Sequence, residues 1–160
     1  MKKIIVIGCP GGGKSTFARK LHDKTGIPLY HLDMIYWNPD KTTVSREIFD
    51  ARLDEILKRE EWIIDGNYAR TMEKRLAACD TAFFLDIPLE TCLDGINARK
   101  GKARPDMPWT DDEDDDEFIS FIRDFEANSK PKILELFGRY PDKKIITFKS
   151  REEISDYFKK

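Results

Sequence analysis

The residues whose types and spacing most clearly point to chemistry lie near the start of the chain. The segment Gly8-Cys9-Pro10-Gly11-Gly12-Gly13-Lys14-Ser15-Thr16 matches the Walker A pattern G-x-x-x-x-G-K-[ST]. Glycines let the backbone bend so that successive N–H groups face inward and form a nest for anions. A chain of this length should match the pattern by accident less than about once in a hundred times. The segment therefore predicts a P-loop that binds a nucleotide.

The chemistry of this loop assigns a role to each residue type. Lys14 would reach the β- and γ-phosphates, and the hydroxyl of Ser15 would be a ligand of Mg²⁺. The helix that follows would turn its positive end toward the phosphates. We expect ATP and Mg²⁺ as ligands, with these binding residues: Gly8, Pro10, Gly11, Gly12, Gly13, Lys14, Ser15 and Thr16.

Two carboxylates follow apolar runs further along the chain. Asp65 comes directly after Trp62-Ile63-Ile64. If that run is a strand beside the first one, Asp65 would lie near Ser15 and could hold a water on the metal, as a Walker B carboxylate does. The alternative is an Asp-Gly turn that only ends the strand. Asp33 could bind an acceptor or take its proton, or could be a solvated loop carboxylate.

Several basic residues could serve a lid that closes over the phosphates. Arg99, Lys100, Lys102 and Arg104 cluster in a segment that we expect to form a lid over about residues 99–117. Such cations would neutralise the charge on a transferring phosphoryl group and help to exclude water; a solvated basic loop is the alternative. Arg70 could act similarly. The predicted catalytic residues are Lys14, Asp33, Arg70, Arg99 and Arg104, and the predicted metal ligands are Ser15 and Asp65.

The elements that would position these residues alternate along the chain. Apolar runs predict strands at 3–7, 28–32, 62–64, 81–87 and 144–148. Helical spacing predicts helices at 14–24, 44–59, 71–78, 89–99, 113–128 and 131–137, and Ser150 with Glu153 has the spacing of a capping box that opens a last helix. This alternation predicts a single α/β domain of three layers, with a parallel five-stranded sheet and helices on both faces. Ligands of such sheets bind beyond the carboxyl ends of the strands.

The composition limits the partners of the chain. Its 160 residues suit one domain. The net charge of −2 disfavours direct binding to nucleic acid or to an acidic membrane, and no apolar run approaches the ~20 residues of a membrane span. The three cysteines are odd in number and lack zinc-ligand spacing. We therefore predict a cytoplasmic protein with reduced thiols; its oligomeric state is not predicted.

The chain also resembles a known family, the adenylate-kinase-like proteins called DNA topology modulation proteins. The likeness rests on the P-loop, on His31-Leu32-Asp33 with Trp37, on Trp62–Tyr68, on Phe84–Pro88, and on Gly101–Met107 followed by Glu117-Phe118-Ile119. It implies a nucleoside-monophosphate-kinase type of P-loop fold with a small helical lid, and ATP binding. Adenylate kinases continue from Asp-Gly with Phe-Pro-Arg, whereas here Arg70 lies one position later.

Two functions follow from these observations. The first is a kinase that moves the γ-phosphoryl group of ATP to a small acceptor, such as a nucleotide-like molecule. The second is a non-enzymatic ATP-binding regulator that affects DNA topology or a protein partner. The chain lacks the N-K-x-D segment that a GTPase would need, and its length favours a small kinase.

Overall fold

A parallel sheet forms the centre of the protein. The computed structural model describes residues 1–9, 13–99 and 123–159. The strands are β1 (Lys3–Gly8), β2 (Leu29–His31), β3 (Trp62–Asp65), β4 (Thr81–Leu85) and β5 (Lys144–Phe148). They lie in the order β2-β3-β1-β4-β5, and every neighbouring pair is parallel. This arrangement confirms the predicted α/β fold with a five-stranded parallel sheet.

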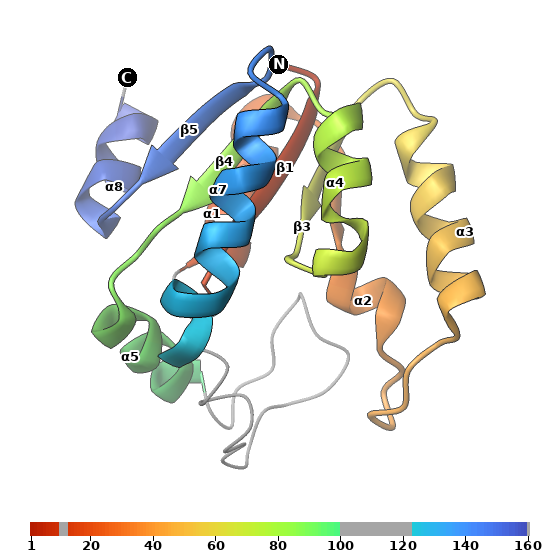
Figure 1. Ribbon diagram of the computed structural model, residues 1–160, viewed down its shortest axis with the longest axis horizontal. Coiled ribbons are helices and arrows are strands. Elements are labelled where there is room, and N and C mark those ends of the chain that lie inside the picture. The colour runs from red at the N-terminus through yellow and green to blue at the C-terminus, as the bar shows by residue number, and fades with distance from the viewer. Residues whose placement is uncertain (10–12, 100–122, 160) are drawn as a thin grey trace.

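Helices cover the sheet from both sides (Figure 1). They are α1 (Lys14–Thr25), α2 (Leu32–Tyr36), α3 (Arg46–Leu57), α4 (Ala69–Ala78), α5 (Leu89–Arg99), α7 (Lys130–Arg139) and α8 (Arg151–Lys159), with a π-helical turn η1 (Phe125–Ser129) leading into α7. In Figure 1, α4 and α7 lie in front of the sheet and α1 lies behind it. None of the helices in the described part of the chain is long and apolar enough to span a membrane.

The central strands are buried on both faces, which explains their uninterrupted apolar sequences. Successive side chains of a strand point to opposite faces, so Ile4 and Val6 belong to one hydrophobic cluster and Ile5 to the other. The first cluster includes residues of α1, and the second includes residues of α3 and α4. Both faces of β1 are thus held by helices, which gives the loop after β1 a firm base.

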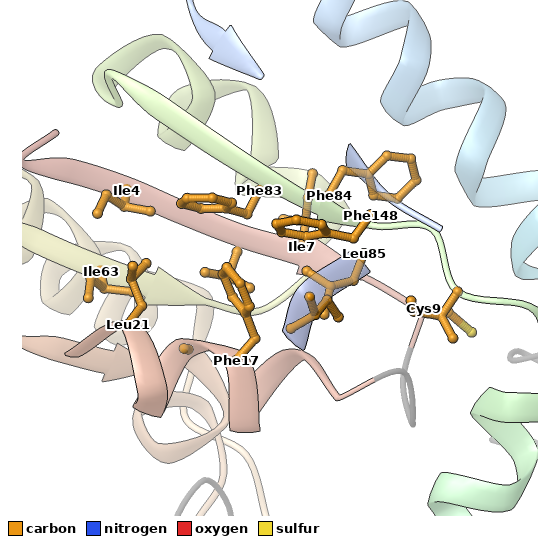
Figure 2. Packing of buried hydrophobic residues seen from close by; sticks show 14 of the residues in the cluster. Ile4, Ile7, Cys9, Phe17, Leu21, Ile63, Phe83, Phe84, Leu85 and Phe148 are labelled. Carbon is orange, nitrogen blue, oxygen red and sulfur yellow. The ribbon is translucent and has the colours of Figure 1, made fainter. Parts of the chain in front are cut away.

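Helix α1 is fixed by the same apolar packing. Phe17, Ala18 and Leu21 are its buried residues, and Figure 2 shows Phe17 and Leu21 pointing toward side chains of the sheet. The ring of Phe17 lies 4.9 Å from that of Phe83, measured between centroids. This packing fixes where α1 begins, and therefore where the P-loop ends.

Several elements end one or two residues from their predicted bounds; β4, for example, ends at Leu85 and not at residue 87. Two differences are larger. Leu32 does not continue the second strand but begins the short helix α2, so Asp33 lies in a helical first turn. The helix predicted at 113–128 falls mostly outside the described residues, and its described end enters the π-helical turn η1. At the last helix, Ser150 Oγ accepts a hydrogen bond from the Glu153 N–H at 3.1 Å, which confirms the first half of the predicted capping box.

Candidate functional site

The register of the sheet brings Asp65 to the P-loop. Strand β3 pairs with β1, and Asp65 lies opposite Val6, two residues before the loop begins. The Lys14 ammonium donates to Asp65 Oδ1 at 2.9 Å, and Ser15 Oγ donates to Oδ2 at 2.8 Å. The two predicted metal ligands and the P-loop lysine therefore meet at the carboxyl ends of β1 and β3.

His31 completes this cluster from the neighbouring strand. It ends β2 opposite Asp65, and its Nδ1 lies 2.6 Å from Asp65 Oδ2. Because both carboxylate oxygens accept hydrogen bonds here, we assign the proton of this contact to the histidine Nδ1. Sequence reasoning did not select His31, although its place at the end of a strand before Asp33 was a usable signal.

Asp65 remains ionised in this environment although it is buried, with 3% of its surface exposed. Burial alone would raise the pKa of its carboxyl group. The positive charge of Lys14 and the hydrogen bond from His31 outweigh burial and hold that pKa well below its usual range. The site therefore offers a buried carboxylate, a hydroxyl and an ammonium within one contact network.

The two ends of the P-loop need glycine. At Gly8 φ is +155°, and a Cβ atom there would lie 2.5 Å from the carbonyl oxygen of Leu85. Gly13 has a φ of +92° and is the N-cap of α1, whose first intrahelical bond runs from Phe17 N–H to its carbonyl at 2.8 Å. Both positions lie in a region of backbone space that other residues rarely adopt. Pro10, Gly11 and Gly12 lie outside the described residues.

The remaining described loop residues are Cys9 and Thr16. Cys9 is buried. A hydrogen bond with the Cys92 thiol and, as the second cause, burial both raise the pKa of the Cys9 thiol. A thiol with a raised pKa is a poor nucleophile at neutral pH, so Cys9 serves packing. Thr16 is exposed, and its Oγ1 accepts a hydrogen bond from Arg19 Nη2 at 3.2 Å.

Asn67 ties the turn after β3 to the start of the P-loop. Its side-chain oxygen accepts from the Gly8 N–H at 3.0 Å, and its Nδ2 donates to the Gly8 carbonyl at 2.7 Å. The Gly66 N–H donates to the carbonyl of Val6 at 3.2 Å. Three hydrogen bonds thus join the turn after β3 to the end of β1, where the P-loop begins.

Arg75 holds the turn after β3 in place, and it was not among the site residues predicted from the sequence. It is fully buried on α4 and donates to the carbonyl oxygens of Gly66 at 2.8 Å, of Tyr68 at 3.0 Å, and of Asn67. Burial lowers the pKa of its guanidinium to about 10, so it remains charged at neutral pH. The sequence does carry a signal for Arg75: it lies beside Leu76 on the buried face of the helix α4.

Asp33 faces a group of aromatic side chains. The Tyr68 hydroxyl donates a hydrogen bond to Asp33 Oδ1, and burial together with the charge of Asp33 raises the pKa of that phenol. Tyr68 has a φ of +33°, and its ring meets Tyr36 at 5.2 Å. The ring of Trp37 lies 5.4 Å from that of Tyr36, measured between centroids. This corner combines a carboxylate, a neutral phenol and aromatic faces.

The predicted arginines do not all join the cluster. Arg70 donates to both oxygens of Asp50 on α3, at 3.1 and 2.7 Å, and that contact raises its pKa. Arg99 is the last residue of α5. Arg104 and all of the predicted lid except Arg99 lie outside the described residues. The catalytic parts proposed for these three arginines stay predictions.

Comparisons with known proteins point to kinases. An adenylate kinase from Thermotoga neapolitana is 28% identical over 88 residues, which cover 54% of this chain and 39% of the relative. One from Mycolicibacterium vanbaalenii is 27% identical over 131 residues, covering 65% of this chain and 72% of the relative. No protein-family model matches the chain. The Thermotoga match thus spans well under half of that enzyme's length.

Solved structures share the fold. A gluconokinase from Sinorhizobium meliloti superposes with a TM-score of 0.60 at 11% identity, covering 97% of this chain and 86% of that one. A shikimate kinase from Bacteroides thetaiotaomicron gives a TM-score of 0.55 at 19% identity, covering 96% and 91%. The fold is therefore the three-layer α/β fold of P-loop kinases. With the adenylate kinase relatives, these findings support a P-loop kinase-like protein.

Proposed function

We propose that this protein is a phosphotransferase that moves the γ-phosphoryl group of Mg²⁺-ATP to a small acceptor. The observation that carries the proposal is the contact network of Lys14, Ser15 and Asp65 at the carboxyl ends of β1 and β3. It joins the one segment that matches a phosphate-binding motif to a buried carboxylate that stays ionised. The kinase relatives support the same reaction class.

The residues of the network fit a magnesium nucleotide as substrate. Mg²⁺ prefers hard oxygen ligands and is usually held by one or two protein groups together with phosphates and water. Ser15 Oγ and the Asp65 carboxylate supply such oxygens, and Lys14 supplies a positive charge for the phosphates. The metal would neutralise the charge that develops on the phosphoryl group.

The acceptor would lie toward Asp33. The Asp33 carboxylate could orient a hydroxyl or phosphate of the acceptor for in-line attack, or could take the proton of the attacking group. The Tyr68 hydroxyl already occupies Asp33 Oδ1, so an acceptor would meet a carboxylate whose orientation is fixed. A nucleotide-like acceptor is our first candidate because the curated relatives are adenylate kinases. Arg99 and Arg104 remain proposed lid residues.

The first experiment measures Mg²⁺-ATP binding by titration calorimetry for the wild type, Lys14→Ala and Lys24→Ala. Lys24 lies on the same helix and contacts the rings of Tyr157 and Phe158, so its variant controls for the loss of one positive charge. We expect Lys14→Ala to weaken binding at least tenfold and Lys24→Ala to leave it within about twofold, since a hydrogen bond to a charged group is worth about 1.5–3 kcal/mol. Equal affinity of wild type and Lys14→Ala would refute the proposal.

A second experiment tests transfer itself. Nucleoside monophosphates, sugars, sugar acids and amino alcohols are incubated with γ-labelled ATP, and labelled products are separated from free phosphate. We expect one acceptor class to be labelled, and Asp33→Asn to abolish labelling while ATP binding persists. A protein that binds ATP and labels none of these would be a regulator instead.

The finer resemblance to the DNA topology modulation proteins leads to a separate proposal, a direct or indirect link to DNA. The net charge of −2 predicts weak DNA binding at physiological salt. Tight, salt-resistant binding to duplex DNA would favour the regulator over the kinase.

A further inference from the structure

A pocket lies next to the network of Lys14, Ser15 and Asp65, which it meets at His31. It has a volume of about 450 Å³ and is formed between α1 and the edge strand β2. Its lining residues on α1 are Thr16, Arg19, Lys20, His22 and Asp23, and those on β2 are Leu29 and His31. Lys14, Ser15 and Asp65 are not among its lining residues, whereas Thr16, the last residue of the P-loop motif, is.

The charges around this pocket favour an anion. Arg19 and Lys20 are the basic residues of the lining besides the histidines, and Asp23 is its single acidic residue. The chain as a whole carries a net charge of −2, so a local excess of positive charge is not a general property of its surface. Opposite charge at a concave site attracts and orients ligands.

Arg19 gives the clearest sign of a missing acceptor. Its Nη2 donates to Thr16 Oγ1 at 3.2 Å, but its Nη1 is buried and makes no hydrogen bond to any described residue. A buried donor without an acceptor costs about 1–3 kcal/mol, and such donors are rare in native structures. A ligand oxygen in the pocket would satisfy it, and the planar guanidinium suits phosphate oxygens.

The two histidines are held in place by contacts outside the pocket. His22 Nδ1 lies 2.5 Å from the Ile27 carbonyl oxygen, and His31 Nδ1 lies 2.6 Å from Asp65 Oδ2. In each ring Nδ1–H is therefore the donor of that contact, and Nε2 is the nitrogen that remains for a ligand. Nε2 can form a hydrogen bond with a hydroxyl group of the ligand.

We propose that the pocket between α1 and β2 binds a small phosphomonoester, with Arg19 and Lys20 holding the phosphate group. The volume exceeds that of a bare phosphate and lies in the range of small-molecule sites, about 300–1,000 Å³. Leu29 supplies an apolar wall for the organic part, and the histidines and Asp23 supply acceptors for its hydroxyl groups. The proposal does not rest on the kinase activity.

The test must separate this site from the P-loop, which also binds phosphate in our account. We therefore use the Lys14→Ala protein and titrate it with glycerol phosphate and, separately, inorganic phosphate, following backbone amide shifts by NMR. We expect saturating shifts at residues 16–23 and 29–31, with a dissociation constant near 1 mM or tighter, about −4 kcal/mol. Tighter binding of glycerol phosphate identifies the ester as the ligand class; equal binding restricts the site to the phosphate group and overturns the assignment of an organic ligand.

Matched variants assign the phosphate to its residues. Adding Arg19→Gln or Lys20→Gln should weaken binding about tenfold each, whereas Lys24→Gln removes the same charge from the same helix outside the pocket and should change it less than twofold. Lys20 is exposed, so Lys20→Gln preserves the fold even if Arg19→Gln does not. Absence of saturation by about 10 mM, well beyond the expected constant, or equal losses in the Lys24 control, would overturn the proposal. Failure to bind ATP would leave it standing.

Discussion

Replacing Arg75 by methionine should destabilise the turn that carries the candidate site. Its guanidinium donates to the carbonyls of Gly66, Asn67 and Tyr68, and its Nε lies 3.3 Å from Thr71 Oγ1. Methionine fills a similar volume without any of these donors. The substitution therefore removes hydrogen bonds while creating little new space.

The magnitude follows from the carbonyls left behind. The hydrogen bond to the Gly66 carbonyl is buried. Leaving this carbonyl without a donor should lower the free energy of unfolding by about 1–3 kcal/mol. The other two are part-buried and can regain water, so about 1 kcal/mol each is appropriate. Methionine also removes the cost of burying a charge, which is visible in the lowered pKa of Arg75. We expect a net loss of about 3 kcal/mol, at the lower end of that sum.

Urea unfolding followed by circular dichroism measures this loss. With a slope of about 1.5 kcal/mol per molar, 3 kcal/mol lowers the midpoint by about 2 M. Thr71→Val removes the longest contact of Arg75 together with the hydrogen bond from Thr71 Oγ1 to the Tyr68 carbonyl at 3.3 Å, and should cost about 1–2 kcal/mol. Arg75→Lys keeps the charge and should lie between the two. If Arg75→Met unfolds at the same urea concentration as Thr71→Val, the support assigned to the guanidinium is wrong.

Two further predictions concern the same region. Asp65→Asn removes the stabilisation that the ionised carboxylate gives to the folded protein. Because the pKa of Asp65 is depressed in the folded protein, this stabilisation is complete above the ordinary pKa near 4. It is lost as the pH falls toward the depressed pKa. The gap in unfolding free energy between wild type and Asp65→Asn should thus shrink by about 1.4 kcal/mol per pH unit below 4, and a gap independent of pH between 5 and 2.5 would contradict this. In Gly66→Ala, at φ +148°, the new Cβ would lie 2.8 Å from Leu32 Cδ1, so the urea midpoint should fall by the equivalent of about 1–3 kcal/mol. The control is Gly138→Ala, where the new Cβ would meet no atom within 4 Å beyond its own stretch of helix, and it should not lower the midpoint.

The parts of the site that could be predicted were those with a strong local signal or a simple topology. The P-loop is a contiguous motif, and the apolar runs predicted the strands. The approach of Asp65 to Ser15 required only that the third strand lie beside the first, as it does. That placement does not test the role of Asp65 in catalysis or metal binding.

For the missed residues, the sequence marks their place in an element but not the groups that they contact. Arg75 bonds to backbone carbonyls, and no residue type in the sequence marks where a carbonyl will point. His31 meets Asp65 through strand register, which hydrophobic pattern does not give by itself. Helix α2 has five residues, fewer than two turns, so periodicity could not distinguish it from the end of a strand.

The contact between Lys14 and Asp65 bears on which form of a nucleotide the protein would accept. An incoming polyphosphate must draw the ammonium away from a carboxylate that is its counter-ion in the structure. A metal-free nucleotide would leave that carboxylate facing more negative charge, whereas a nucleotide that carries a divalent cation would replace the partner that Asp65 gives up. The exchange of counter-ions would thus make the loop selective for the metal complex. Without a nucleotide, Asp65 neutralises the Lys14 ammonium and so weakens its attraction for other anions.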